Sequence, residues 1–344
     1  CFDKILELDG RNIPALGDRA EILLLSEKYE EALSCYDKAL DIAEEHNIIS
    51  TIWFRKGYIL ERYGKYEEAI LCYNKAIDTN QNNMFAWNSK VTLLYNQKKY
   101  TEAIICCDMA IKIYPDCVFA WLTRGLSMYE TGTYEEALSS FDRVLEIEPG
   151  NSSAWSYRLQ AMVMVGVELD KKGRYDESIQ YYDKVLAINS ENVHAWLNRG
   201  QSLFLQGKYD GAVECCYKAI DIDPFYSTGR NNLGYYLYKS GKYEEALINI
   251  DKAIELDPAN SDAWDSKGEI LMSAGKYAEA LLCYDRALGM NSEVAVYWCG
   301  KGHALKGQGQ YEKAIECYER ALKIDPYCVE AFKAKSDLIK GKKI

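Results

Sequence analysis

Four side chains of metal-binding types recur at matched positions late in the sequence. Asp265 and Glu269 are four residues apart, and Cys299 and His303 occupy the equivalent places 34 residues later. Residues four apart share one face of a helix, so carboxylate, thiolate and imidazole groups could point toward one ion. However, packed neighbouring helices are about 8–10 Å apart, and Asp and Cys are short. The sequence therefore predicts no metal site here, only an acidic surface beside a solvated His303.

The twelve cysteines do not form a redox or zinc motif. No Cys-x-x-Cys occurs, and the adjacent pairs Cys106–Cys107 and Cys215–Cys216 point in different directions on a helix. Most of the others are one repeating unit apart, beyond the ~7 Å Cα limit for a disulfide. We therefore expect small packing residues in a reducing compartment, and hence a cytoplasmic protein. Seven cysteines share one place in the unit: Cys1, Cys35, Cys72, Cys106, Cys215, Cys283 and Cys317.

Catalytic motifs are absent from the sequence. Its three histidines, His46, His194 and His303, belong to no Ser–His–Asp order and no HExxH motif. The Gly-x-Gly string at Gly300 and Gly302 follows no predicted strand, so it is not a dinucleotide loop. We expect neither an enzyme nor a bound cofactor.

These residues belong to a repeated sequence motif, which is clearest at Gly241-Lys-Tyr243-Glu-Glu-Ala246. Its alanine returns every 34 residues in the runs 69–103–137 and 212–246–280–314. A fixed period of that length indicates a stacked array of one supersecondary unit. Each unit reads as two helices: in 261–294, Ser261 is expected to cap the first helix, Gly275 to end it, and Tyr277 to open the second.

The unit resembles the tetratricopeptide repeat (TPR) through Trp264, Gly268, Leu271, Gly275, Tyr277, Ala280, Tyr284 and Ala287. Lys267 departs from the pattern, because the family prefers Leu there. Four other tryptophans, Trp53, Trp121, Trp196 and Trp298, likewise precede a glycine by four residues. The resemblance covers essentially the whole chain. It implies an all-α fold, a tetratricopeptide-type helix-pair solenoid forming a right-handed superhelix.

We expect a single array over residues 1–344. It comprises a half-repeat at 1–8, nine full repeats and a capping helix at 329–340, the repeats starting near 13, 50, 84, 118, 159, 193, 227, 261 and 295. Because residue 1 is Cys, the chain is expected to be a piece of a longer protein. Seven extra residues follow the fourth repeat and predict one long helix over about 153–172. Its middle is apolar all round, which fits either packing within the protein or a protrusion that binds a partner or a second copy.

The resemblance also implies that the first helix of each unit lines a concave groove. Asn offers a donor and an acceptor to a peptide backbone, and Tyr offers contact area with a hydroxyl, so the expected ligand is an extended peptide or partner segment. No complete unit has the Lys that the family's chaperone-tail clamp requires. The expected contact residues are Arg55, Asn88, Thr92, Tyr95, Asn198, Gln201, Asn231, Asn232, Tyr235, Tyr238, Asp265 and Glu269.

Charge and hydropathy limit the other partners. The net charge of −11 argues against a nucleic-acid binder, which needs clustered Lys and Arg. No run of 18 apolar residues is present, so no membrane span is expected. The predicted function is a protein-interaction scaffold for a partner of unknown identity. Two alternatives stay open: a self-assembling homo-oligomer, and a regulatory or targeting module of a larger protein.

Overall fold

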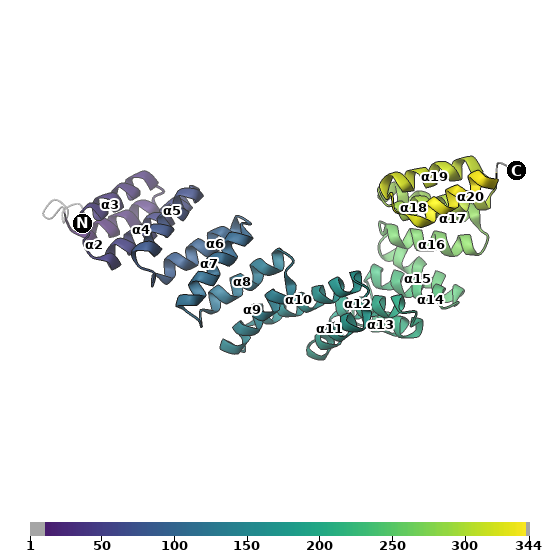
Figure 1. The fold of residues 1–344 in the computed structure, drawn as a ribbon, viewed down its shortest axis with the longest axis horizontal. Coiled ribbons are helices and arrows are strands. Elements are labelled where there is room, and N and C mark those ends of the chain that lie inside the picture. The colour runs from purple at the N-terminus through teal and green to yellow at the C-terminus, as the bar shows by residue number, and fades with distance from the viewer. Residues whose placement is uncertain (1–10, 342–344) are drawn as a thin grey trace. The chain divides into compact units, whose positions relative to one another are not determined.

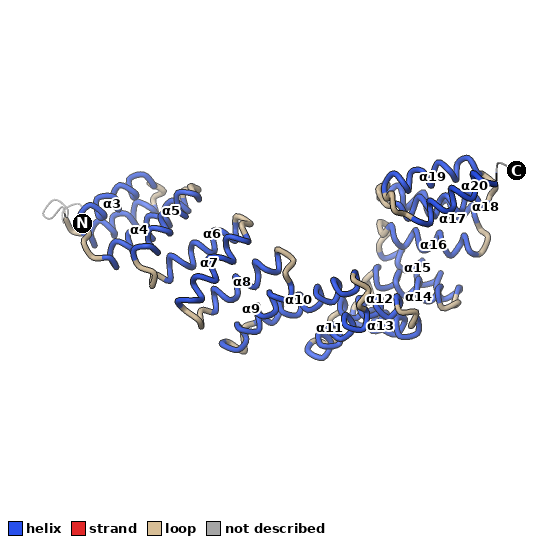
Figure 2. Tube along the Cα trace, viewed as in Figure 1, coloured by secondary structure: helices blue, strands red, loops and turns tan. Residues whose placement is uncertain are grey.

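The computed structural model describes residues 11–341, and this part of the chain is entirely helical, without strands (Figures 1 and 2). The all-α helix-pair prediction is confirmed. The predicted half-repeat at 1–8 lies outside the described residues. The first helices of the pairs are α2 (Ile13–Leu25), α4 (His46–Arg62), α6 (Met84–Asn96), α8 (Val118–Glu130), α10 (Ser152–Lys171), α12 (Val193–Leu205), α14 (Ser227–Lys239), α16 (Ser261–Ser273), α18 (Ala295–Gly307) and α20 (Val329–Gly341). The second helices are α3 (Tyr29–Ile42), α5 (Tyr66–Thr79), α7 (Tyr100–Ile113), α9 (Tyr134–Ile147), α11 (Tyr175–Ile188), α13 (Tyr209–Ile222), α15 (Tyr243–Leu256), α17 (Tyr277–Met290) and α19 (Tyr311–Ile324).

Every second helix in the described chain begins at a tyrosine, because the turn before it has one geometry. In the pair α14–α15, Gly241 has φ +87°, and the next residue, Lys242, donates its N–H to the Leu237 carbonyl at 2.9 Å. This left-handed residue closes the first helix and reverses the chain. Glu27 and Lys98 stand at the same place with φ 58° and 59°, although neither is glycine.

The first helices begin differently from the sequence prediction. Ser261 is the first residue of α16, not its cap. Asn260 caps the helix, since its side-chain oxygen accepts a 3.0 Å hydrogen bond from the Ala263 N–H. An asparagine does the same for α12, where Asn192 accepts from the Ala195 N–H at 2.9 Å. The helix α4 begins at His46, before the repeat start predicted near 50, so the residues just ahead of that start belong to the helix.

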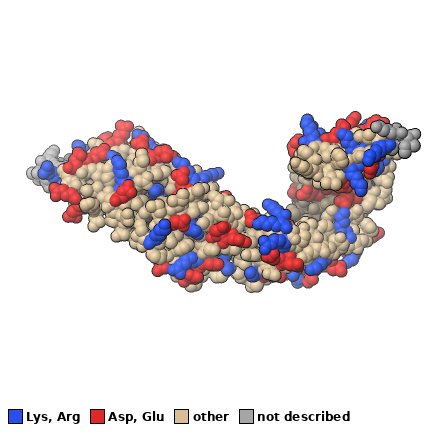
Figure 3. Space-filling model, in the orientation of Figure 1, with Lys and Arg blue, Asp and Glu red and all other residues tan. Residues whose placement is uncertain are grey.

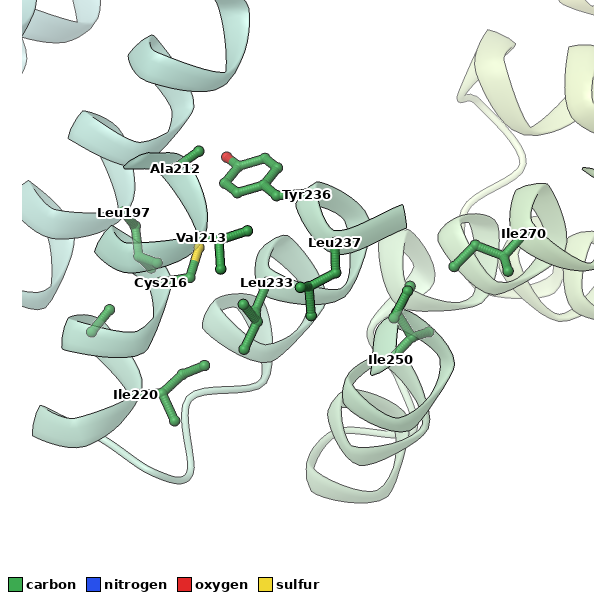
Figure 4. Packing of buried hydrophobic residues seen from close by; sticks show 12 residues of the cluster. Leu197, Ala212, Val213, Cys216, Ile220, Leu233, Tyr236, Leu237, Ile250 and Ile270 are labelled. Atoms are coloured by element: carbon green, nitrogen blue, oxygen red, sulfur yellow. The ribbon is translucent and has the colours of Figure 1, made fainter. Parts of the chain in front are cut away.

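Small residues let the paired helices approach closely. A Cβ placed on Gly268 would lie 2.9 Å from the Tyr284 ring, and one on Gly234 would lie 2.9 Å from the Ala246 carbonyl oxygen. Ala246, Ala280 and their equivalents are fully buried. Figure 4 shows the resulting core of α12–α16, in which buried side chains of successive helices point toward one another. The Gly and Ala that the repeated motif shares between units are therefore packing residues.

The helices form two compact units, Cys1–Met162 and Val163–Ile344, and the sequence boundary between them falls within α10. The assignment of 1–344 to a single array stays a prediction. The long helix predicted over 153–172 is confirmed as α10, with 20 residues. Its start resembles an ordinary first helix, because the Trp155 indole donates to the Pro149 carbonyl at 2.9 Å as Trp121 does to Pro115 at 2.8 Å.

The C-terminal part of α10 packs against α11 as an ordinary first helix packs against its second helix. Gly166 lies against Tyr182, since a Cβ at this glycine would be only 2.5 Å from the ring, and these two residues are as far apart in sequence as Gly268 and Tyr284. In the apolar middle of the helix, Met162 and Val165 are buried, and Val163, Met164 and Val167 are partly buried. This burial favours packing over protrusion.

Candidate functional site

A polar contact is repeated between successive helix pairs, and it explains the unusual Lys267. Its ammonium lies 2.6 Å from the Asp251 carboxylate and 5.9 Å from the Trp264 ring centroid. The same arrangement joins a cation to an acid of the preceding second helix in several other pairs: Arg124–Asp108, Arg158–Asp142, Arg199–Asp183 and Lys301–Asp285. Figure 3 shows such charges interspersed on the visible surface. These ion pairs connect neighbouring helices and are separate from the candidate site.

The candidate residues of the first compact unit do not form one cluster. Arg55 on α4 is paired with Glu21 of α2 at 2.8 Å. On α6, the Thr92 hydroxyl donates to the Asn88 carbonyl at 2.8 Å, and Tyr95 makes an edge contact with Tyr100 at 5.5 Å between ring centroids. All three α6 side chains are partly buried.

The α12 and α14 candidates of the second unit differ in accessibility. Asn198 and Asn232 are partly buried and keep some exposed surface. Gln201 is exposed, but its side-chain oxygen accepts a 2.6 Å hydrogen bond from the buried Tyr236. Asn231 is only 7% exposed, and its side-chain oxygen is enclosed without a hydrogen-bond partner in the described structure. Of the four residues, Asn198 and Asn232 are the ones that keep exposed surface and make no side-chain hydrogen bond in the described structure.

Four predicted residues do come together, with one that the prediction omitted. We call Tyr235, Tyr238 and Lys239 of α14 with Asp265 and Glu269 of α16 the tyrosine–acid cluster. The Lys239 ammonium lies 2.6 Å from the Glu269 carboxylate, and 5.0 and 4.9 Å from the Tyr235 and Tyr238 ring centroids. The two tyrosine rings are 6.3 Å apart. The cluster therefore contains both aromatic surface and charge.

The two carboxylates of the cluster differ in electrostatic state. Burial, followed by the charges of Glu269 and Asp262, raises the pKa of Asp265 to about 7. Burial by itself would lower the pKa of Lys239, but the hydrogen bond to Glu269 raises it above its usual value. The Lys239 ammonium therefore neutralises the charge of the Glu269 carboxylate. In the described part of the chain, the Asp265 carboxylate has no hydrogen bond and no ion pair, and only the acids Glu269 and Asp262 act on its charge. This partly buried acid therefore has no countercharge of its own.

Sequence reasoning missed Lys239 and Tyr297. Lys239 follows the predicted contact residue Tyr235 by four residues, so it shares a helix face with Tyr235 and its spacing is a usable signal. Tyr297 of α18 donates hydrogen bonds to Asp262 and to Ser261, the latter at 3.1 Å. That contact crosses from one pair to the next, and no single unit reveals it. Its consequence is that Asp262 is already satisfied.

Family models match most of the described chain. Models described as tetratricopeptide repeat match residues 13–82, 54–116, 231–295, 193–226 and 295–328, and one described as TPR repeat matches residues 168–207. The chain belongs to the tetratricopeptide repeat family. A protein prenyltransferase alpha subunit repeat model also matches residues 134–164, without showing catalysis. No protein with a curated description matches this tetratricopeptide repeat protein.

Solved structures include similar folds at low identity. A thermophilic TPR protein of Thermus thermophilus is 20% identical with TM-score 0.49, over 53% of this chain and 98% of that one. PilF of Pseudomonas aeruginosa is 20% identical with TM-score 0.49, over 64% and 97%. YrrB, described as a TPR protein with an unusual peptide-binding site, is 21% identical with TM-score 0.40, over 58% and 99%.

The family assignment sets the broad function. A tetratricopeptide repeat protein is a scaffold for protein interactions, and the fold is typical of non-enzymatic proteins. Among the helices of residues 11–341, none combines the length and the apolar character that a membrane crossing requires.

Proposed function

We propose that this protein binds an extended segment of a protein partner along the first helices α12, α14 and α16, and that Asp265 receives a Lys or Arg side chain of that segment. The single observation that carries the proposal is the state of Asp265. It is a partly buried carboxyl with a raised pKa beside a carboxylate that Lys239 already neutralises. A cationic side chain would supply the missing countercharge.

The neighbouring tyrosines support this assignment. Tyr235 and Tyr238 are partly buried and lie on the same helix face as Lys239. Aromatic side chains provide large contact area at low entropic cost and are common binding hot spots. The methylene groups of an entering Lys or Arg could pack on these rings while its charge meets Asp265.

Asn198 and Asn232 provide a second kind of contact. They occupy the same place in consecutive pairs, α12–α13 and α14–α15, and each keeps exposed surface. An amide side chain donates and accepts hydrogen bonds, so it can match a backbone N–H and C=O together. The proposed ligand is therefore held by its backbone at the asparagines and by one cation at Asp265. On α6, Asn88, Thr92 and Tyr95 are proposed as a separate contact area, whereas Arg55 must leave Glu21 to take part.

Peptide selection tests the proposal while the partner is still unidentified. The full chain is used to select binders from a random peptide display library, and the affinity of one enriched peptide is measured by titration calorimetry. We expect Lys or Arg at one fixed position of the enriched set. Asp265→Asn should reduce affinity at least about tenfold, since charged hydrogen bonds are worth about 1.5–3 kcal/mol.

Two further measurements sharpen the test. The exposed Glu244→Gln on α15 is the matched control and should bind as the wild type does. Asn198→Ala combined with Asn232→Ala should weaken binding while the thermal transition stays nearly unchanged. Binders without a required cation, or equal affinity for Asp265→Asn and wild type, would contradict the proposal.

The remaining proposals concern location and assembly. A cytoplasmic location is supported by the many buried cysteines of the described chain that form no disulfide bond. The net charge of −11 supports a protein partner over nucleic acid. The burial of the middle of α10 gives self-assembly no specific support, and sedimentation at several concentrations would detect it.

A further inference from the structure

The helices α18 and α20 bring three potential metal ligands together. Cys299 and His303 lie one turn apart on α18, and Glu330 lies in the first turn of α20. One ligand atom from each of the three lies within 4.8 Å of the others, and the His303 Nδ1 is 3.6 Å from a Glu330 carboxylate oxygen. The sequence pattern relates Cys299 and His303 only to Asp265 and Glu269 of α16. The structure places a different acid beside them.

A fourth donor is adjacent. Cys328 directly precedes α20, and its side chain is hydrogen-bonded to that of Cys299. We propose that Cys299, His303, Cys328 and Glu330 bind a Zn²⁺ ion. Two thiolates, one imidazole and one carboxylate are ligand types that tetrahedral zinc sites use.

The geometry needs only local adjustment to close around the ion. With Zn–S bonds of about 2.3 Å and Zn–N bonds of about 2.0 Å, ligand atoms of a tetrahedral site lie roughly 3.5 Å apart. The separations among Cys299, His303 and Glu330 exceed that by roughly an ångström at most. Glu330 has a side chain that is 73% exposed, so it can rotate freely toward the other ligands.

The same junction elsewhere in the repeat carries no ligand set. In the preceding pair, Asp265 and Glu269 take the places of Cys299 and His303, and Val294 and Val296 take those of Cys328 and Glu330. The four donors are therefore not a by-product of the repeat pattern. Their concentration at one junction is what distinguishes α18 and α20 from the helix pairs that share their packing.

The surroundings suit a cation. Cys299 is 3% exposed, and a Glu330 carboxylate oxygen lies within 4.8 Å of its sulfur. A zinc ion would displace the thiol protons and offset the negative charge. It would also link α20 to α18 directly.

Zinc binding can be measured on the full chain. The protein is reduced, stripped with a chelator, exchanged into buffered free Zn²⁺ and analysed for metal content. We expect one zinc ion per chain and a higher thermal transition in zinc. Co²⁺ should give the intense near-ultraviolet absorption of a cobalt–thiolate bond. Glu330→Gln and His303→Asn should each weaken zinc binding at least about tenfold, as even loss of an outer-shell partner can do.

Matched variants keep the test decisive. Cys317→Ser changes a buried cysteine of the same hydrophobic cluster that lies outside the ligand set, and it should bind zinc normally. Because Glu330 is largely exposed, Glu330→Gln should fold even if His303→Asn does not. Absence of stoichiometric zinc in the reduced protein, or zinc binding that is unchanged in both Glu330→Gln and Cys299→Ser, would overturn the proposal.

Discussion

Lys239 on α14 and Glu269 on α16 form an ion pair of 2.6 Å in which each side chain is only about 30% exposed. Removal of one partner from such a pair strongly destabilises the fold, because the other charge stays buried without its partner. We expect Lys239→Met to destabilise the chain by about 2 kcal/mol and to raise the pKa of Asp265 further. Chemical denaturation measures the first effect. The double variant Lys239→Met with Glu269→Leu should recover most of the loss, and failure to recover would show that the ion pair is not its cause.

Asp265 makes stability depend on pH in the acidic range, up to about pH 7. Its folded-state pKa is raised to about 7, so the native state holds a proton that the unfolded chain releases near its lower ordinary pKa. Between those two values, stability falls as pH rises, by up to about 1.4 kcal/mol per pH unit from this group. It is greatest below the unfolded-state pKa and levels off above about pH 7.

Denaturant unfolding of wild type and Asp265→Asn between pH 4 and 8 tests this pH dependence. The difference between the two curves isolates Asp265 from the other titrating groups. The variant should gain stability relative to wild type as the pH rises. Parallel curves would contradict the raised pKa. A bound cationic peptide should lower the pKa of Asp265, and with it the pH at which the two curves separate, because its charge favours the ionised carboxylate.

Lys98 occupies a backbone conformation that glycine adopts more easily. Its φ of 59° matches the place where other turns have glycine, such as Gly132 with φ 80°. Lys98→Gly should therefore stabilise the chain by about 1 kcal/mol. Gly132→Ala is the reciprocal change and should destabilise it by a similar amount. Urea midpoints compare the two, and a loss of stability in Lys98→Gly would refute the argument.

Gly234 permits the close crossing of α14 and α15. A methyl group there would lie 2.4 Å from Ile250 Cγ1 and 2.9 Å from the Ala246 carbonyl oxygen. Gly234→Ala should cost about 1–3 kcal/mol through overpacking. Gly289→Ala is the control, since nothing lies within 4 Å of the added methyl, and alanine is favoured over glycine in a helix by about 1 kcal/mol. Thermal melts should move in opposite directions.

The repeat period predicted the helix pairs well because the same few packing residues recur in each. Tyr243, Gly241 and Ala246 have roles that depend only on their own pair, so one well-read unit serves for the others. The first-helix caps were missed because Asn260 and Ser261 are both good capping residues, and the choice depends on where the preceding turn ends.

The candidate site was harder to predict because its contacts join different pairs. Glu269 meets Lys239, and Cys299 meets Glu330, through the offset between neighbouring first helices. The packing of neighbouring helices sets that offset, so it cannot be predicted from the residues of a single unit. Asn231 shows the same difficulty. Its inward position predicted a contact residue, yet the structure encloses its side-chain oxygen.

The buried cysteines of the second helices can serve as native probes of local opening in each helix pair. Six of them occupy one place in six different pairs, and all are at most 6% exposed: Cys35, Cys72, Cys106, Cys215, Cys283 and Cys317. An alkylating reagent can reach each thiol only when its pair opens, so each alkylation rate reports the opening free energy of that pair. Mass spectrometry of the alkylated peptides would thus measure local stability repeat by repeat without any mutation.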